Sequence, residues 1–275
     1  MDIKLICFDL DGTFLDEKKN IPERNIQALE AAAARGVHIV PSSGRTYAGM
    51  PDALRALPFI RYVIAANGAI IYDAKEDKVL YRAMIPLDLA LKFYDYADTL
   101  PVVYDCYTEM GGFTSRSMWP LYEKYIPDAE LCKHVIAMRR PVDDLKSFLR
   151  ENGGDLLKMQ MFFVDMEERR RQLEKLPGLF PELIFASSIP GNIEVNIADG
   201  SKGQAMARLC RMLGLDISQS MALGDGSNDR DMIKNAGLGV AMANADPALL
   251  KIADYVTGHC NEAGVAQAVE RFVLG

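Results

Sequence analysis

Short apolar runs alternate with helix-patterned segments near both ends of this chain. The apolar run 3–8 is followed by a segment with helical spacing that begins near Pro22 and stops at Gly36. A second apolar run follows at 37–40 and a third at 62–66. Apolar runs of this length, separated by helices, are typical of βαβ crossovers and a parallel sheet. The ends of the chain therefore predict an α/β domain.

The alternation is interrupted in the middle of the chain. Two apolar runs, 70–72 and 79–81, flank a polar stretch and predict a β-hairpin. Helix-like and strand-like patterns are then mixed until the first rhythm resumes at Ile193. We expect a Rossmann-like core with a parallel sheet, formed by residues 1–84 and 190–275, and an inserted α+β domain of residues 85–189.

The composition excludes several functional classes. With 31 Lys+Arg against 38 Asp+Glu the formal net charge is −7, which argues against binding nucleic acid, because that binding needs uncompensated basic clusters. The apolar stretch near the N-terminus is too short for a signal sequence or a membrane span. Five cysteines without a CxxC pair indicate reduced thiols. We therefore expect a cytoplasmic protein that binds neither nucleic acid nor membranes.

Carboxylates follow two of the predicted strands. Asp9 and Asp11 are two residues apart at the end of the first apolar run, and Asp225 follows the run 221–223. The carboxyl ends of strands form the ligand-binding edge of an open α/β sheet, so these side chains converge if the two strands are neighbours. Carboxylates gathered in this way repel each other unless a cation lies among them, and oxygen ligands suit Mg²⁺. The sequence predicts a magnesium site.

Four motifs resemble those of the haloacid dehalogenase-like phosphatases. They are, in order, DLDGT at 9–13, SGR at 43–45, Lys202 in SKG, and GDGSND at 224–229. The large insertion between the second and third motifs looks most like the Cof-like subgroup. That resemblance implies a haloacid dehalogenase-like catalytic core and makes the insertion a type-II (IIB-like) cap that selects the substrate.

The resemblance also implies roles for the acidic residues. Asp9 would be the nucleophile that forms an aspartyl-phosphate, and Asp11 would be the general acid and base. Mg²⁺ would be bound by Asp9, Asp11 through its carbonyl oxygen, and Asp225. Thr13 would support the turn through its hydroxyl. Asp229 would be an acceptor behind the metal ligands or a helix-start residue.

Donors to the phosphoryl oxygens follow from the same resemblance. They would be the Leu10 amide, the Ser43 hydroxyl, the Gly44 amide, the Lys202 ammonium and the Asn228 carboxamide. Helices expected to begin just after Ser43 and Asn228 would add positive dipole ends. Arg45 could touch the substrate or pair with a carboxylate, and the sequence does not separate these roles.

The expected activity is Mg²⁺-dependent hydrolysis of small phosphomonoesters, such as sugar phosphates or related metabolites. One alternative is a phosphomutase or phosphotransferase that uses the same aspartyl-phosphate. Another is a non-catalytic module that binds a phosphate ligand, but the set of Asp9, Asp11, Lys202 and Asp225 weighs against it. The expected partner is a small phosphorylated metabolite, and the expected assembly is a monomer or weak homodimer.

Overall fold

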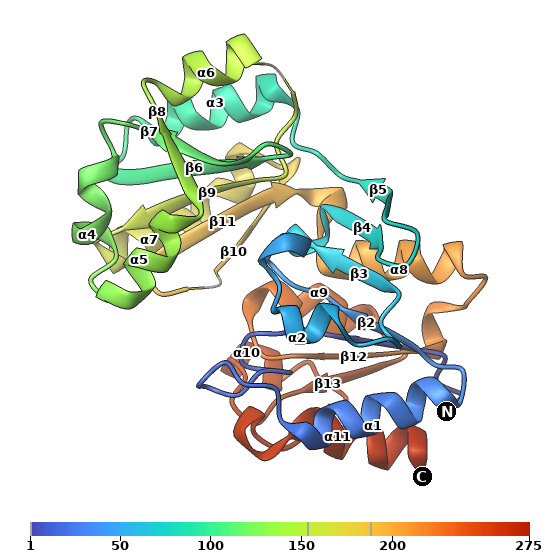
Figure 1. The fold of residues 1–275 in the computed structure, drawn as a ribbon. Coiled ribbons are helices and arrows are strands. Elements are labelled where there is room, and N and C mark those ends of the chain that lie inside the picture. Colours follow the sequence, from blue (N-terminus) through green and yellow to red (C-terminus); the bar gives the residue numbers. More distant parts are fainter. Residues whose placement is uncertain (1, 153, 188) are drawn as a thin grey trace. The chain divides into compact units, whose positions relative to one another are not determined.

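The chain forms two compact units in the computed structural model, which describes residues 2–152, 154–187 and 189–275. Unit 1 consists of residues 1–82 and 199–275, and unit 2 consists of residues 83–198. Figure 1 shows the two units, each built around its own sheet. Each is described by itself below.

The central sheet of unit 1 is parallel throughout. Its strand order is β14-β13-β12-β1-β2. The strands are β1 (Leu5–Phe8), β2 (His38–Pro41), β12 (Ser220–Gly224), β13 (Leu238–Ala241) and β14 (Tyr255–Val256). Every residue of β1, β12 and β13 is buried, as continuous apolar runs in a parallel sheet require.

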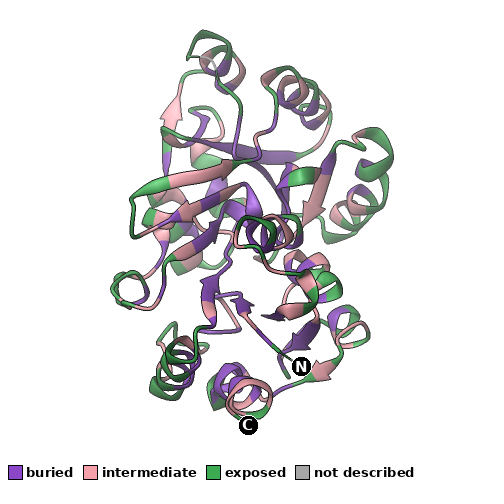
Figure 2. Cartoon of the chain, turned by 90° about the vertical axis from the view of Figure 1, so that its right-hand side faces the viewer, coloured by how far each residue is buried: buried purple, intermediate pink, exposed green. Residues whose placement is uncertain are grey.

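Side chains of the central strands alternate between two separate apolar clusters. The helices of unit 1 are α1 (Glu23–Ala34), α2 (Asp52–Arg55), α8 (Lys202–Met212), α9 (Arg230–Asn235), α10 (Pro247–Leu250) and α11 (Gly264–Val269). In β1, Ile6 and Phe8 contribute to the cluster that includes α1 and α11, whereas Leu5 and Cys7 contribute to the cluster that includes α8 and α9. This period of two places helices on both faces of the sheet. In Figure 2 the strands carry mostly the colours of buried and intermediate residues, while exposed residues lie mainly on helices and loops.

Three antiparallel strands continue unit 1 beyond β2. They are β3 (Tyr62–Ala65), β4 (Ile70–Asp73) and β5 (Lys78–Arg82), in the order β3-β4-β5. Single parallel bridges between Ile39 and Ile60 and between Ser42 and Ile64 connect this sheet to the end of β2. The predicted hairpin across 70–81 is confirmed as β4 and β5.

Unit 2 is an α+β domain with a six-stranded sheet in the order β10-β11-β9-β6-β7-β8. The strands are β6 (Val102–Thr108), β7 (Gly111–Ser115), β8 (Arg139–Val142), β9 (Lys158–Phe163), β10 (Leu183–Ala186) and β11 (Asn192–Ile197). The helices are α3 (Leu87–Ala97), α4 (Tyr122–Tyr125), α5 (Ala129–Ala137), α6 (Leu145–Asn152) and α7 (Met166–Leu179). Helices α3, α6 and α7 share one apolar cluster with the sheet, and α4 and α5 share another. The expected combination of a parallel α/β core and an inserted α+β unit is confirmed.

The unit boundaries and one helix differ from the sequence-based expectations. The first boundary lies between Arg82 and Ala83 rather than at 84/85. The second lies between Ala198 and Asp199, later than the expected 189/190, because β11 pairs with β9 and β10 of unit 2. The prediction of a helix just after Ser43 is wrong. The chain there is irregular up to a 3₁₀ turn at Tyr47–Gly49, and α2 has only four residues. Among the described residues, no helix is long and apolar enough to cross a lipid bilayer.

Candidate active site

The candidate site lies at the carboxyl edge of the parallel sheet in unit 1. Strands β1 and β12 are direct neighbours, with Phe8 paired to Leu223, and the Asp9 amide continues the ladder to the Leu223 carbonyl at 3.0 Å. Asp9 and Asp225 each follow one of these strands. Two segments more than 200 residues apart in the sequence therefore bring their carboxylates to one edge.

Three carboxylates gather at this edge. One oxygen from each of Asp9, Asp225 and Asp229 lies within 4.8 Å of the others. Asp229 is fully buried and Asp9 almost so, whereas Asp225 is partly exposed. Such a concentration of negative charge at low exposure needs cations to offset it.

Lys202 supplies one of these cations. Its side chain is fully buried, and its Nζ lies 2.6 Å from Oδ1 of Asp9 and 2.6 Å from Oδ1 of Asp229. The residue is placed by α8, whose first turn is capped by the Ser201 hydroxyl accepting from the Gln204 amide. Although burial by itself lowers the pKa of Lys202, the charges of Asp229 and Asp9 outweigh it and raise that pKa, so the ammonium stays protonated.

Asp229 holds the loop that follows β12. Its second oxygen, Oδ2, accepts hydrogen bonds from the amides of Asp225 and Gly226, both at 3.0 Å. Both of its carboxylate oxygens therefore have protein donors. This is the arrangement of an acceptor that orients a neighbouring ligand rather than of a freely exposed one.

Asp225 is oriented from the opposite side by the loop after β1. The Thr13 hydroxyl donates to its Oδ1 at 2.6 Å. Gly12 has a φ of +83°, and a Cβ at that position would collide with the Asp225 carboxylate. Glycine at position 12 thus meets two needs, the left-handed backbone and the close approach of an acidic side chain. Thr13 contacts Asp225 directly, beyond the turn-supporting role expected from the sequence.

The carboxylates of the cluster outnumber the cation that contacts them, and the pKa values of Asp9 and Asp225 are raised. Burial raises the pKa of Asp9 well above its ordinary value, although Lys202 opposes the rise. Burial and the charge of Asp229 raise the pKa of Asp225 to about 7. Three carboxylates facing one ammonium retain a deficit of positive charge.

A divalent cation would supply the positive charge that the acidic cluster lacks. Carboxylate oxygens are the ligands that Mg²⁺ prefers, and it is commonly held by one or two carboxylates with water and substrate oxygens completing the octahedron. Asp9 and Asp225 each have only one oxygen committed to a hydrogen bond with another described residue. These two residues, together with the expected carbonyl oxygen of Asp11, would hold the ion, with Asp229 behind them.

Asp11 lies outside this acidic cluster. Its carboxylate accepts from Nε and Nη2 of Arg45, at 2.9 and 2.8 Å, and from Nζ of Lys19 at 2.8 Å. Burial by itself raises the pKa of Asp11, but the hydrogen bonds and charges of Arg45 and Lys19 outweigh it and lower that pKa to about 2. Of the two roles left open for Arg45, the structure shows pairing with a carboxylate of the site.

The expected phosphate donors come from three loops at the same edge. Among the described residues, the Leu10 amide donates to no acceptor. Ser43 is buried, and its hydroxyl accepts from the Arg45 amide at 3.3 Å. Gly44 follows it. Asn228 lies in the 3₁₀ turn Ser227–Asp229 that leads directly into α9, so a helix start is present there, unlike at Ser43.

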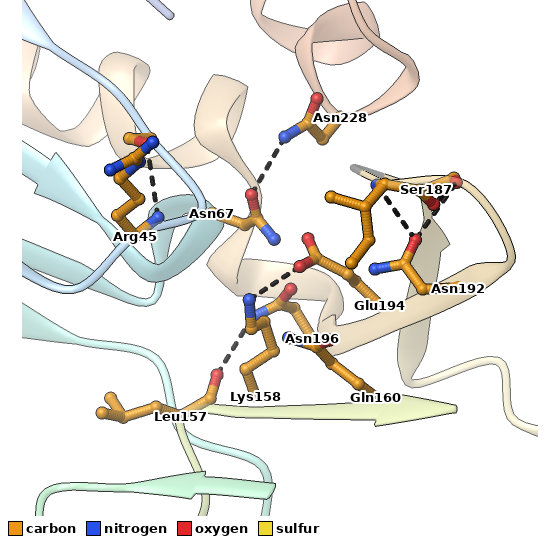
Figure 3. Close-up of polar contacts among 12 residues, drawn as sticks. Arg45, Asn67, Leu157, Lys158, Gln160, Ser187, Asn192, Glu194, Asn196 and Asn228 are labelled. Carbon is orange, nitrogen blue, oxygen red and sulfur yellow. Dashed lines mark hydrogen bonds and ion pairs between the residues drawn. The ribbon is translucent and has the colours of Figure 1, made fainter. Parts of the chain in front are cut away.

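Asn67 was not predicted from the sequence as a residue of the candidate site. It follows β3, is buried, and accepts a hydrogen bond at its Oδ1 from the Asn228 carboxamide at 3.1 Å (Figure 3). The available signal was the Asn-Gly pair directly after an apolar strand, which favours positive φ. Lys19 was also missed, and its position in an exposed polar segment gave no signal.

One face of the sheet in unit 2 carries buried polar side chains, also drawn in Figure 3. Lys158 and Glu194 form an ion pair at 2.7 Å between β9 and β11, and Asn196 donates to the Leu157 carbonyl at 3.0 Å. Gln160 of β9 is also buried, is the register partner of Glu194 in β11, and accepts a hydrogen bond at its Oε1 from Nη2 of Arg139 at 3.3 Å. Elsewhere in unit 2, Arg116 and His134 are exposed, and Arg116 pairs with Asp143.

Comparisons with known proteins are consistent with this geometry. A family model described as haloacid dehalogenase-like hydrolase matches residues 6–269. YxeH of Bacillus subtilis (strain 168) is 32% identical, with 98% of each chain covered. From the same organism, 5-amino-6-(5-phospho-D-ribitylamino)uracil phosphatase YcsE is 31% identical over 100% of this chain and 97% of the relative. The solved structure of the haloalkanoate-superfamily phosphatase BT1666 from Bacteroides thetaiotaomicron has a TM-score of 0.83 at 28% identity, covering 98% of this chain and 95% of that one.

Proposed function

Because the chain belongs to the haloacid dehalogenase-like hydrolase family and is an enzyme of the phosphatase type, we propose that it hydrolyses small phosphomonoesters in a Mg²⁺-dependent reaction through an aspartyl-phosphate. The observation that carries the proposal is the position of Asp9. Its carboxylate lies at the end of a central strand, 2.6 Å from the Lys202 ammonium and close to Asp225 and Asp229. A nucleophile that attacks an anion needs such compensating charge.

Asp9 is the nucleophile of the proposed reaction. One carboxylate oxygen forms a bond to phosphorus while the bond between phosphorus and the ester oxygen breaks. Lys202 donates to Oδ1 of Asp9 and compensates negative charge at the carboxylate during the attack. Water then attacks the phosphorus of the acyl phosphate, and the bond between phosphorus and the Asp9 oxygen breaks, releasing inorganic phosphate and restoring the carboxylate.

Asp11 is the proposed proton carrier. It donates a proton to the departing alkoxide in the first step and accepts one from the attacking water in the second, so that protons balance over the cycle. Its two ion pairs with Arg45 and Lys19 keep it close to the nucleophile, which is two residues away. For the donating step at least one of these pairs has to open.

Positive charge at the reacting phosphoryl group has two proposed sources. Bound Mg²⁺ would neutralise charge on the phosphoryl oxygens and bring them towards Asp9. The fixed donors would be the amides of Leu10 and Gly44, the Ser43 hydroxyl, Lys202 and the Asn228 carboxamide. Donors held in place before the reaction stabilise its transition state without reorganisation at the moment of transfer.

The proposed substrates are small phosphorylated metabolites, sugar phosphates among them, and unit 2 is proposed to select among them. The relative YcsE is named for a phosphorylated ribityl compound, which belongs to this class. The buried polar side chains on the sheet of unit 2 support a selective role, because hydroxyl-rich molecules are recognised by amides and charges. We expect Gln160→Ala to change the ranking of substrates while leaving p-nitrophenyl phosphate hydrolysis within about twofold of wild type.

The five cysteines are all free and buried. This supports the proposal that the enzyme works in a reducing compartment, the cytoplasm.

The decisive experiment is a panel of phosphate esters assayed with and without Mg²⁺, using wild type and Asp9→Asn. We expect phosphate release from wild type only with the metal, none above background from the variant, and a phosphorylated Asp9 in wild type quenched with acid during turnover. Wild-type rates in Asp9→Asn would refute the nucleophile assignment. Undiminished hydrolysis in excess chelator would refute the metal dependence.

A further inference from the structure

The turn after β3 has an unusual backbone. Ala66, Asn67 and Gly68 have φ angles of +51°, +60° and +108°, so three consecutive residues lie in the region that L-residues other than glycine avoid. All three residues are buried. A non-glycine residue stays in this region only where its surroundings fix it, and such positions cluster at functional sites.

Backbone hydrogen bonds join this turn to the loop that carries Ser43 and Gly44. The Ser43 amide donates to the Ile64 carbonyl, the Asn67 amide donates to the Ser43 carbonyl, and the Ala66 amide donates to the Arg45 carbonyl, each at 2.9 Å. The loop 43–45 therefore lies against the turn residue by residue. Its path depends on the left-handed conformation of the turn.

The Asn67 side chain reaches two of the expected phosphate donors. Its Oδ1 accepts from Nδ2 of Asn228 at 3.1 Å, and a Cβ built on Gly44 would lie 2.9 Å from the same oxygen. One N–H of the Asn228 carboxamide is thereby directed to Asn67. The orientation of its second N–H, the one that could serve a phosphoryl oxygen, is fixed by the same bond (Figure 3).

Gly68 extends the contacts of the turn to a third segment. A Cβ at this position would collide with the carbonyl of Ser201, the residue that caps α8 directly before Lys202. The turn therefore adjoins the loop 43–45, the loop of Asn228 and the start of α8. These three segments carry most of the proposed phosphate donors.

We propose that the turn 66–68 sets the positions of the phosphate-binding groups and that Asn67 is its positioning residue. The proposal rests on the proposed function, because it assigns Asn67 to the same anion site. Asn67 acts through Asn228 and the loop 43–45. The backbone strain of the turn is the cost of placing a carboxamide between two loops that come from different strands.

Binding of inorganic phosphate to the full chain in the presence of Mg²⁺ tests this proposal without turnover. Asn67→Gly keeps the left-handed backbone accessible and removes only the carboxamide. We expect an affinity for phosphate about tenfold lower than that of wild type, which corresponds to the loss of one oriented hydrogen bond. The melting temperature should stay within about 3 °C of wild type, since glycine relieves strain but adds entropy to the unfolded chain.

Ala66→Gly is the matched control, because it relaxes the same turn and retains the carboxamide. We expect its affinity for phosphate to stay within about twofold of wild type. Unchanged affinity in Asn67→Gly would overturn the proposal. An equal loss in both variants would overturn the assignment to the side chain, because flexibility of the turn would then explain it.

A double-mutant cycle tests the contact itself. Gly44→Ala places a methyl group against the Asn67 carboxamide and should lower the melting temperature in the wild-type background. We expect a smaller loss in the Asn67→Gly background, where the obstacle is absent. Additive losses of melting temperature would contradict a contact between positions 44 and 67.

The outcome for phosphate binding is separable from the outcome for catalysis. A wild-type chain that binds phosphate and hydrolyses no ester would refute the phosphatase proposal, while weaker binding by Asn67→Gly would still support the role of the turn. A wild-type chain that binds no phosphate would overturn the proposal for Asn67.

Discussion

Arg45 holds both carboxylate oxygens of Asp11. Its Nε donates to Oδ2 at 2.9 Å and its Nη2 donates to Oδ1 at 2.8 Å, while its Nη1 is anchored on the Gly49 carbonyl at 3.2 Å. Bidentate pairs between guanidinium and carboxylate are among the strongest hydrogen-bonded contacts in proteins. Asp11 is therefore held in its ionised form, and proton donation by this residue requires its ion pair with Arg45 to open.

Replacing Arg45 tests whether its ion pair with Asp11 contributes to proton transfer. Arg45→Gln should raise the pKa of Asp11 from about 2 towards the ordinary range. The substitution removes the hydrogen bonds and the charge of Arg45, which lower this pKa most strongly. The substitution should also remove the two hydrogen bonds that orient the Asp11 carboxyl group. We expect hydrolysis of an alkyl phosphate to fall by about tenfold or more, and that of p-nitrophenyl phosphate by less than about threefold, since nitrophenolate leaves without a proton.

Carboxyl carbon NMR of Asp11 and steady-state rates with the two esters check these expectations. Lys19→Gln is the matched control, because Lys19 is exposed and contacts only Oδ1 of Asp11. It should have the smaller effect on both measurements. Equal losses on both esters in Arg45→Gln would mean that Arg45 supports the fold of the site rather than the proton transfer.

The meeting of Asp9 and Asp225 could be predicted from the sequence, and the partners of Asp11 and Asn67 could not. Strand ends in a parallel sheet share one edge, so two carboxylates that follow neighbouring strands must converge. Arg45 reaches Asp11 across the edge of the sheet, and Asn67 reaches Asn228 across 161 residues. Such side-chain contacts depend on loop conformations that no periodicity encodes.

The boundary at the end of unit 2 had a usable signal. In the segment 192–197, Ile193 and Val195 belong to the apolar cluster with α3, α6 and α7, whereas Asn192, Glu194 and Asn196 alternate with them. This alternation is typical of an antiparallel strand and differs from the continuous apolar runs of β1 and β12. The helix expected after Ser43 failed for another reason, because the tertiary hydrogen bonds of the loop 43–45 with the turn after β3 outweigh local propensity.

Asp9→Asn should abolish turnover and preserve the fold. The carboxamide has nearly the same volume as the carboxylate and no strongly nucleophilic oxygen, so we expect phosphate release to fall by at least about a thousandfold. The melting temperature of the metal-free variant should stay near or above that of wild type, because one of three mutually repelling carboxylates is removed. Circular dichroism and an ester assay check both expectations, and retention of more than a tenth of the activity would contradict the role of Asp9.

Lys202 should be the most sensitive residue of the site for stability. Its Nζ is the cation in contact with both Asp9 and Asp229, and Lys202→Met leaves two buried carboxylates without it. Removing one partner from a buried ionic group costs about 3–5 kcal/mol. For a chain of this size we expect the melting temperature to fall by roughly 6–15 °C.

Saturating Mg²⁺ should raise the melting temperature of Lys202→Met more than that of wild type, because the bound cation then replaces part of the positive charge that Lys202 supplied. Differential scanning calorimetry with and without the metal measures the difference. Lys251→Met, which changes an exposed lysine directly after α10, is the control and should shift the melting temperature by no more than about 2 °C. A melting temperature of Lys202→Met equal to that of wild type would show that the acidic cluster is not held together by this residue.

Binding of Mg²⁺ should become tighter as the pH rises through about 7. Without metal, burial and the charge of Asp229 raise the pKa of Asp225 from its ordinary value of 3.8 to about 7, so below that pH a proton competes with the cation. The folded metal-free chain then holds a proton that the unfolded chain releases, and its free energy of unfolding should fall as the pH rises from about 4 to 7. Calorimetric titration with Mg²⁺ in two buffers of different ionisation enthalpy should show proton release near pH 6 and little above pH 8. Asp225→Asn should reduce this pH dependence and remove most of the affinity, and an affinity that is constant from pH 6 to 8 in wild type would place the cation away from Asp225.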